Sequence, residues 1–182
     1  VAAASRCLSW SLAEDGAALD ALWEARRGCY LAAISYRDDQ GGQKGGGGGG
    51  GGSGRGKDKV YLSDTCVPLS RLADCISETE EDFLRCGMCP IMCCHIADGN
   101  FHCCIPYQPD EKEVMQGLEH RMISRAISMG GTVSGEHGVG VGKVRHIAEE
   151  HGEEKLKVMR ALKTALDPHN LMNPGKLLEL PG

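Results

Sequence analysis

The chain has 182 residues, a formal net charge of -5 and only 4% aromatic residues. This length allows one domain with a proper hydrophobic core, and the acidic balance lacks the basic footprint that nucleic acid or an anionic membrane surface requires. No apolar run approaches the roughly 20 residues that span a bilayer. Because the chain begins at Val1 and has no signal-peptide pattern, we interpret it as a piece of a longer protein.

The ten cysteines do not predict a disulfide framework. Nothing in the sequence signals secretion, and a chain of this length does not depend on disulfides for its stability. Cys86 and Cys89 form a C-x-x-C motif, which is either redox-active or one half of a zinc site, but no second such pair follows at zinc-finger distance. We therefore expect most of the cysteines to be free thiols that act as small buried hydrophobic residues.

The first part of the chain predicts one helix and one insert. Residues 13–36 are rich in helix-forming residues, and several larger side chains recur at helical spacing on one side: Leu19, Leu22, Trp23 and Arg26. Residues 41–58 contain an unbroken glycine run, which loses too much backbone entropy on ordering to be structured. This segment is predicted to be a disordered insert.

The remainder of the chain predicts an α+β domain. The patterns indicate a strand, a helix, two strands, a helix and a further strand, at residues 59–67, 70–84, 91–97, 100–106, 109–129 and 132–134, with Ser70 capping the first helix. This order is that of a ferredoxin-like antiparallel sheet with helices on one face. C-terminal helices follow over residues 144–166, with a break at Gly152 and a packed face of Leu156, Met159, Leu162 and Leu166.

Asp98-Gly99 predicts a hairpin with a two-residue loop between the third and fourth of these segments. In that register His95 lies directly opposite His102, close enough for the two imidazoles to share a metal ion. Strict alternation assigns one face to the core, with Met92, Cys94, Ile96, Phe101, Cys103 and Ile105. It assigns the other face, left open by the helices, to a site, with Cys93, His95, Ala97, Asn100, His102 and Cys104.

Residues 130–143 are rich in glycine but do not form a nucleotide-binding loop. His137 occupies the first glycine position of the P-loop pattern, and Arg145 stands where the dinucleotide pattern needs its third glycine. What remains is an adjacent pair, Glu136 and His137, on a backbone that can approach another molecule closely.

Four motifs together resemble the C-terminal domain of FAD-linked oxidases, in the vanillyl-alcohol oxidase flavoprotein superfamily: GEHGVGVGK, MRALKTALDPHNLMNPGKLL, HIADGNFH and DTCVPLS. Within it, the chain is most similar to mitochondrial-type D-lactate dehydrogenases, over nearly all its length except the glycine insert. The resemblance implies that residues 1–182 form the substrate and metal domain. It also implies that the N-terminal FAD-binding domain is absent from this chain, which alone would be inactive.

The resemblance further implies a divalent metal, zinc or manganese, held by His95, His102 and Glu136. His137 would be the general base for the substrate hydroxyl and would contact the substrate. Glu136 would also lie beside the cofactor.

For the substrate, the resemblance implies that Arg26 binds the carboxylate, with Lys59 as a further contact. Asn173 and its turn would lie near the FAD. The implied reaction is oxidation of a small 2-hydroxy acid, D-lactate to pyruvate, in mitochondria, with hydride transfer to FAD and electrons passed to cytochrome c or another acceptor.

Three alternatives remain open at this point. A sister dehydrogenase would act on glycolate or D-2-hydroxyglutarate through the same site. A non-catalytic module would instead hold a closed structural zinc with two histidines and two cysteines, His95, His102, Cys93 and Cys104. The chain could also be an inactive fragment. A requirement for Glu136 in metal binding separates the dehydrogenase site from the cysteine site.

Overall fold

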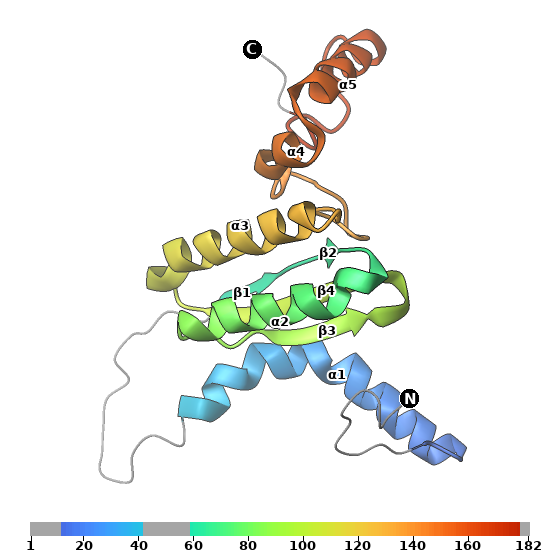
Figure 1. The fold of residues 1–182 in the computed structure, drawn as a ribbon, viewed down its shortest axis with the longest axis vertical. Helices are drawn as coiled ribbons and strands as arrows, with labels where there is room; N and C mark the ends of the chain where they lie inside the picture. Colours follow the sequence, from blue (N-terminus) through green and yellow to red (C-terminus); the bar gives the residue numbers. More distant parts are fainter. Residues whose placement is uncertain (1–11, 42–58, 179–182) are drawn as a thin grey trace.

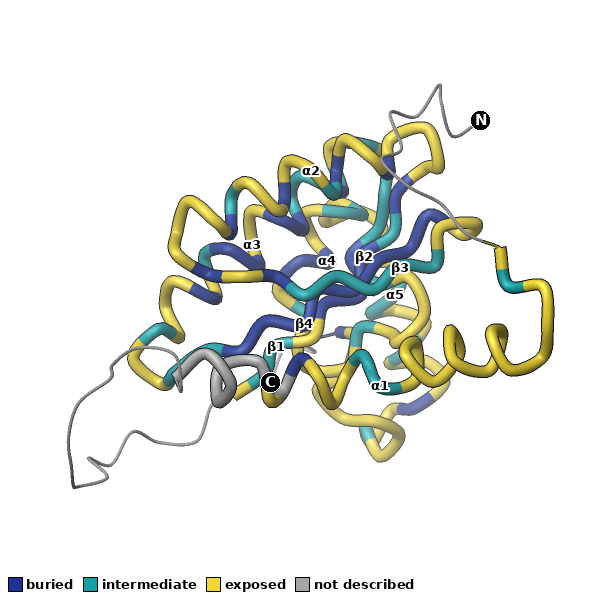
Figure 2. The backbone as a smooth tube through the Cα atoms, turned by 90° about the horizontal axis from the view of Figure 1, so that it is seen from below, coloured by how far each residue is buried: buried dark blue, intermediate teal, exposed yellow. Residues whose placement is uncertain are grey.

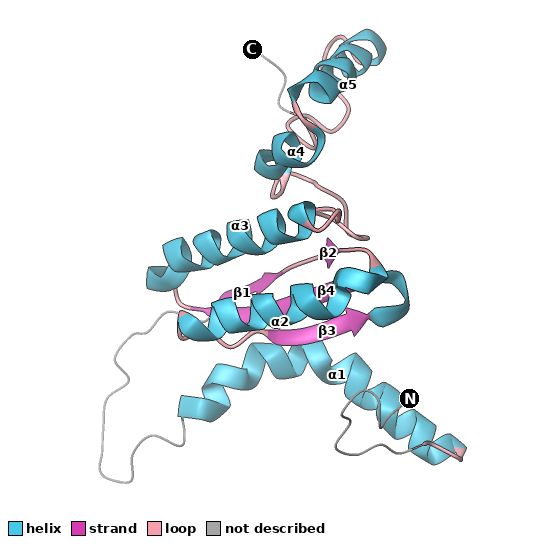
Figure 3. Cartoon of the chain, in the orientation of Figure 1, coloured by secondary structure: helices cyan, strands magenta, loops and turns pink. Residues whose placement is uncertain are grey.

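The computed structural model describes residues 12–41 and 59–178. The predicted insert lies outside these residues, except that Gly41 ends the first helix. The described elements (Figure 3) are α1 (Gly16–Gly41), β1 (Lys59–Leu62), β2 (Thr65–Cys66), α2 (Leu69–Arg85), β3 (Ile91–His95), β4 (Asn100–Tyr107), α3 (Lys112–Ser128), α4 (Val144–His151) and α5 (Glu153–Leu166). Short 3-10 turns occupy Ile96–Asp98 and Pro109–Glu111.

The strands form one antiparallel sheet with β4 at its centre (Figure 1). β1 and β2 pair in succession along one side of β4, and β3 pairs along the other. The predicted strand at residues 132–134 is reduced to a single bridge between Thr132 and Cys66, beyond β2. The resulting order is the one expected of the predicted ferredoxin-like arrangement, so the α+β prediction is confirmed.

The core lies between the sheet and the helices α2 and α3, which cover one face. β4 is almost wholly buried, as Figure 2 shows. The predicted helix stripes and the predicted core face of the hairpin meet here: Leu72, Thr79, Phe83, Met115, Leu118, Met122, Ala126, Phe101, Cys103 and Ile105 are all buried. Met92 and Cys94 pack against this cluster from β3. Helical and strand periodicity therefore predicted the side chains that form this core.

The opposite face of the sheet is not open, contrary to the prediction. Helix α1 crosses it and contacts β4 (Figure 1). The expected Leu19–Leu22–Trp23 side does not make this contact, since those side chains are 49–61% exposed. Ala33, fully buried, and Cys29, half-buried, lie on the helix turns that meet the sheet. Because these residues are small, the helix packs closely without a large apolar stripe.

The hairpin between β3 and β4 also differs from the prediction. Its turn is the 3-10 segment Ile96–Asp98, and the register pairs His95 with Asn100 and Cys93 with His102. A two-residue turn would need positive φ at both central positions, whereas only Gly99 has it, at +73°. The register therefore shifts by two residues, and an even shift keeps the side chains of the paired residues 91–95 and 100–104 on their predicted faces.

The turn is fixed by its contacts with the segment that follows β2. Val67 N–H donates to the Gly99 carbonyl at 3.0 Å, and Cys66 Sγ donates to the Asp98 carbonyl at 3.4 Å. A Cβ atom on Gly99 would lie 2.1 Å from the Val67 carbonyl oxygen. The 3-10 turn directs Ile96 outward, where its side chain is 70% exposed rather than in the core as predicted.

Four other expectations are corrected. The predicted strand at residues 59–67 is interrupted at Ser63-Asp64, and helix α2 begins after Pro68 without a side-chain cap, so Ser70 does not cap it. Leu162 and Leu166 are 59% and 83% exposed rather than packed. Of the described cysteines, which are all free thiols, only Cys75, Cys103 and Cys104 are buried.

None of the described helices is long and apolar enough to cross a bilayer.

Candidate metal and substrate site

The interruption between β1 and β2 creates the floor of the site. At Ser63 the chain still pairs with β4, through Ser63 N–H to the Cys103 carbonyl at 3.0 Å and Cys103 N–H to Ser63 Oγ at 2.7 Å. The Ser63 carbonyl turns to accept from Nδ1 of His102 at 2.9 Å. This contact places a proton on Nδ1, and a ring whose single proton lies there presents the lone pair of Nε2 toward the surface.

Asp64, the other residue of the interruption, holds the loop that carries Glu136 and His137. Its buried carboxylate accepts from the backbone N–H groups of Glu136 and His137, at 3.1 and 2.8 Å, and from the Ser134 hydroxyl at 2.7 Å. Lys143 Nζ approaches it at 3.4 Å. Asp64 therefore ties the loop to the sheet through four groups.

These contacts keep Asp64 ionised although it is buried. Burial alone would raise its pKa, but the hydrogen bonds from His137, Ser134 and Glu136, with the charge of Lys143, hold the pKa well below its ordinary value. The lone pairs of this carboxylate are occupied by those donors.

The loop brings Glu136 to both hairpin histidines. Its Oε1 lies 2.9 Å from Nε2 of His102 and 3.2 Å from Nε2 of His95, and the three side chains offer ligand atoms within 4.8 Å of one another. The two imidazole rings meet edge to face, with centroids 5.3 Å apart. His95 and His102 were expected to meet as a directly opposed pair in the hairpin. Although the register is shifted, they still meet, at Glu136.

This arrangement fits a divalent cation. A His102 ring whose single proton lies on Nδ1 has an acceptor at Nε2, and Oε1 of Glu136 is also an acceptor, so at 2.9 Å the two atoms repel unless a proton or a cation lies between them. Two imidazoles and one carboxylate make a three-ligand set that leaves coordination positions open. Asn100 Nδ2 donates to Oε1 of Glu136 and to Oδ1 of Asp64, both at 3.2 Å, and so steadies the ligand carboxylate.

The structure does not support the alternative of a structural zinc site with two histidines and two cysteines. Among residues 12–41 and 59–178, the groups of three potential ligands that share one locus contain histidine and carboxylate side chains but no cysteine. Cys93 and Cys104 line the same hollow, yet they do not join His95 and His102 in one ligand set. A second set, Asp64 with His102 and His137, shares His102 but depends on the carboxylate that its donors already occupy.

His137 lies next to the ligand set with its ring accessible. Its ring stacks on that of His102, at a centroid distance of 5.0 Å and an interplanar angle of 2°. Nε2 lies 3.9 Å from Oε1 of Glu136, and the side chain is about half exposed. An accessible imidazole beside a metal locus can exchange a proton with a molecule bound there.

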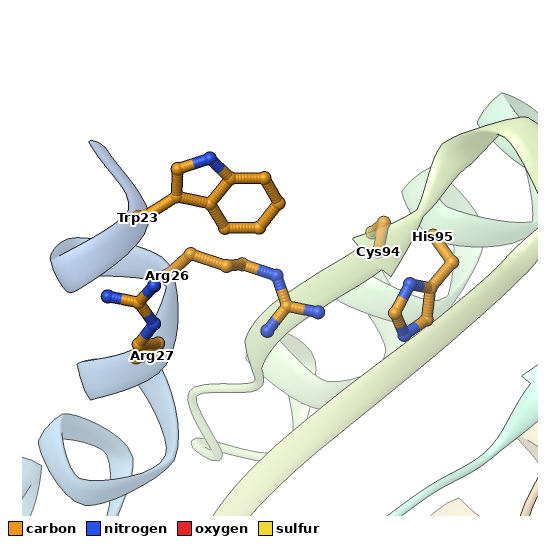
Figure 4. A pocket seen from close by; sticks show the side chains of 5 residues that line it. All are labelled: Trp23, Arg26, Arg27, Cys94 and His95. Atoms are coloured by element: carbon orange, nitrogen blue, oxygen red, sulfur yellow. The ribbon is translucent and has the colours of Figure 1, made fainter. Parts of the chain in front are cut away.

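Arg26 completes the hollow from the helix that crosses the sheet. A cavity of about 260 Å³ is lined by Arg26, Cys29, Tyr30, Leu62, Cys93, His95, His102, Cys104, Glu136 and His137. Figure 4 shows Arg26 reaching from α1 toward His95, with the Trp23 ring beside it, in an adjoining hollow of about 730 Å³. Arg27 instead pairs with Glu24 at 2.5 Å, whereas Arg26 has no carboxylate partner among the described residues. Arg26 is thus available to an anionic ligand.

Two predicted residues lie elsewhere. Lys59 is at the far end of β1, paired with Tyr107, and does not line the hollow. Asn173, with φ at +49°, lines a separate apolar hollow of about 830 Å³ between α5, the C-terminal turn and the loop at Gly138. The loop that lines this hollow, from Gly138 to Gly140, directly follows His137 in the sequence. The Leu177 N–H donates to the Gly140 carbonyl at 2.8 Å and so joins the C-terminal turn to this loop.

Sequence reasoning missed the supporting residues Asp64, Asn100 and Cys29. For Asp64 a signal existed, because the polar pair Ser63-Asp64 interrupts an otherwise apolar strand pattern. For Asn100 the signal was weaker: it lies on the predicted site face, but its bridge between two carboxylates depends on a loop distant in sequence. Nothing in the sequence indicates the contact of Cys29, since it depends on how α1 is placed.

Comparison with known proteins decides the family. Residues 2–177 match the family described as FAD linked oxidases, C-terminal domain. The chain belongs to this family. It is 39% identical over 171 residues to a probable mitochondrial D-lactate dehydrogenase of Danio rerio, covering 92% of the chain and 31% of that protein.

Two further relatives agree. The chain is 36% identical to the mitochondrial D-lactate dehydrogenase [cytochrome] 1 of Saccharomyces cerevisiae, covering 98% of the chain and 28% of that protein. It is 32% identical to the glycolate oxidase subunit GlcD of Bacillus subtilis, covering 66% of the chain and 26% of that protein. The chain thus spans less than a third of the length of each of these relatives.

Proposed function

We propose that the chain is the substrate and metal domain of an FAD-dependent D-2-hydroxy acid dehydrogenase that converts D-lactate to pyruvate. The observation that carries the proposal is the convergence of His95, His102 and Glu136 on one locus, beside the guanidinium of Arg26, which has no carboxylate partner among the described residues. A cavity of about 260 Å³ lies below the usual range for drug-sized ligands, which favours a small acid.

We assign a role in this reaction to three residues of the chain. Arg26 offers a planar fork of donors to the substrate carboxylate. His137 is placed to accept the hydroxyl proton, at a ring that reaches the hollow. Glu136, held through Asp64 and Asn100, keeps its carboxylate between the two histidines. When bound, the metal would supply Lewis acidity toward the hydroxyl and the flavin would supply the hydride acceptor.

The names of the relatives support a proposal for the electron acceptor and the compartment. Because the names of similar proteins include cytochrome and mitochondrial, we propose cytochrome c as the electron acceptor and a mitochondrial location. Zinc and manganese both suit two imidazoles and a carboxylate, so the proposal extends to either metal. The apolar hollow around Asn173 is proposed to face the flavin-binding part of the protein.

Glycolate is the second candidate substrate, because the similarity extends to a glycolate oxidase subunit. D-2-hydroxyglutarate is less favoured. Its second carboxylate needs a second cation, and among the described residues that line the hollow Arg26 is the one arginine or lysine.

The test is the metal content of the purified chain and of Glu136→Ala, by elemental analysis after gel filtration with zinc or manganese. We expect the variant to lose one equivalent, because Glu136 contributes the third ligand. Glu154→Ala, an exposed glutamate paired with Lys157 on α5, is the matched control and should retain it. Unchanged metal in Glu136→Ala, with loss in a Cys93→Ser, Cys104→Ser double variant, would contradict the proposal and identify a structural zinc site.

A further inference from the structure

A second group of metal-ligating side chains lies between α3 and α4, apart from the hollow described above. His120 on α3 and His146 and Glu149 on α4 offer ligand atoms within 4.8 Å of one another. The imidazole rings stack at a centroid distance of 5.6 Å and an interplanar angle of 20°, and Nδ1 of His120 lies 4.0 Å from Oε2 of Glu149. The group shares no residue with the Glu136 site.

The local sequence explains why these three residues meet. His146 and Glu149 are three apart on α4, so they lie on one face of the helix. This face packs against α3, where His120 follows the buried Glu119. The side chain of His146 is only 3% exposed, whereas that of His120 is 62% exposed, so the group has one fixed ligand and an open side.

The surroundings of His146 prepare one ring nitrogen for a metal. Arg145 Nε donates to Nε2 at 3.0 Å, and Oε1 of Glu119 lies 3.9 Å from the same nitrogen. Because Nε2 accepts this hydrogen bond, it carries the lone pair of the ring and is the nitrogen that can bind a metal, in place of the contact with Arg145. Arg145 also donates from Nη2 to Oε2 of Glu119, so it keeps a carboxylate partner when Nε2 binds a metal.

We propose that His120, His146 and Glu149 form a second metal site, which binds a divalent transition metal of the zinc class and joins α3 to α4. Two imidazoles and one carboxylate favour zinc, cobalt or nickel over magnesium or calcium. The fourth position, on the exposed side of His120, is left to water. Because Lys143 precedes α4 and contacts Asp64, a metal here would also steady the loop that carries Glu136 and His137.

The test uses Glu136→Ala as the background, which removes the first site. Zinc is titrated against a chromogenic chelator, and thermal unfolding is followed with and without zinc. We expect one equivalent to bind and to raise Tm. His120→Ala and Glu149→Gln should each weaken binding by about tenfold or more and abolish the rise in Tm. His151→Ala, also on α4 but outside the group, is the matched control and should leave both unchanged.

Folding of the variants is checked by circular dichroism and by Tm without zinc, and the exposed His120 can be truncated without loss of packing. Equal zinc affinity in His120→Ala and in the background would overturn the proposal. So would zinc binding that persists in His120→Ala but disappears when the thiols are alkylated, since the cysteines would then be the ligands. Neither result depends on the proposed dehydrogenase function.

Discussion

At the scale of single residues, two adjacent arginines on α1 have different environments. Arg27 pairs with Glu24 and lines only the adjoining hollow of about 730 Å³, while Arg26 also lines the cavity of about 260 Å³ with His95 and Glu136. A charge-assisted hydrogen bond contributes about 1.5–3 kcal/mol, which corresponds to at least about tenfold in affinity. Helical spacing placed Arg26 on the side of Leu19, Leu22 and Trp23, but spacing alone gave neither arginine a role.

We therefore expect Arg26→Ala to raise KM for D-lactate about tenfold or more in the complete enzyme. Arg27→Ala removes only an exposed pair, which contributes little, and should change KM less than about twofold. Steady-state kinetics on the two variants make the comparison. Equal effects of both substitutions would contradict the assignment of the carboxylate contact to Arg26.

Asp64 is the residue on which the geometry of the site depends, although in the proposal it contacts neither the metal nor the substrate. Its ionised carboxylate satisfies two backbone N–H groups, one hydroxyl and the charge of Lys143. Asp64→Asn replaces one of the two carboxylate oxygens, which accept these hydrogen bonds, by an amide NH2 group, which donates. We expect a loss of about 3–5 kcal/mol in the free energy of unfolding, because Lys143 loses the charge of its carboxylate partner and keeps only the backbone carbonyl of residue 64.

The pH dependence of this loss has a defined sign. Because the folded-state pKa of Asp64 lies below its ordinary value of 3.8, its contribution is present above that value and is lost as pH falls through the folded-state pKa. The difference between wild type and Asp64→Asn should therefore be largest near neutral pH and shrink in acid below about pH 4. Urea unfolding at pH 7 and pH 3 measures it. A difference that is equal at both pH values would show that Asp64 acts through packing alone.

At the scale of elements, the sequence predicted the helices and the faces of the strands better than it predicted the turns. Periodicity identified the buried stripes of α2 and α3, because a core requires that each helix present one apolar side. The hairpin turn was wrong because its conformation depends on Val67 and Cys66, which contact it from a distant strand. The prediction of which sheet face each residue of the paired strands occupies remained correct, because the register shifted by an even number of residues.

The candidate site shows the same division. His95 and His102 were predicted to share a face, and they do, whereas their bridging by Glu136 came from the resemblance. The contact between that loop and Asp64 spans 72 positions of sequence, which no local pattern reports. The position of α1 over the sheet was also missed, since the contact uses small residues such as Ala33 rather than a large apolar stripe.

At the scale of the whole molecule, the described chain has an apolar surface without a covering element. α4 and α5 extend away from the sheet beyond α3 (Figure 1), and the end of α5 exposes Leu162 and Leu166. Both line the 830 Å³ hollow that also contains Asn173. Exposed apolar patches of this kind mark contact surfaces. Because the chain covers only 31% of its Danio rerio relative, we propose that the remaining flavin-binding part of the protein packs here.

This proposal predicts opposite results in the isolated chain and in the complete protein for a Leu162→Ser, Leu166→Ser double variant. In the isolated chain both side chains are already in water, so the free energy of unfolding should change by no more than about 0.5 kcal/mol. In the complete protein the same substitutions should reduce the fraction of flavin retained after gel filtration, measured by its absorbance. Val158→Ser is the matched control, because Val158 is 60% exposed on the same helix but does not line the hollow. Equal flavin retention in the wild type, the double variant and Val158→Ser would show that the flavin-binding part packs against another surface.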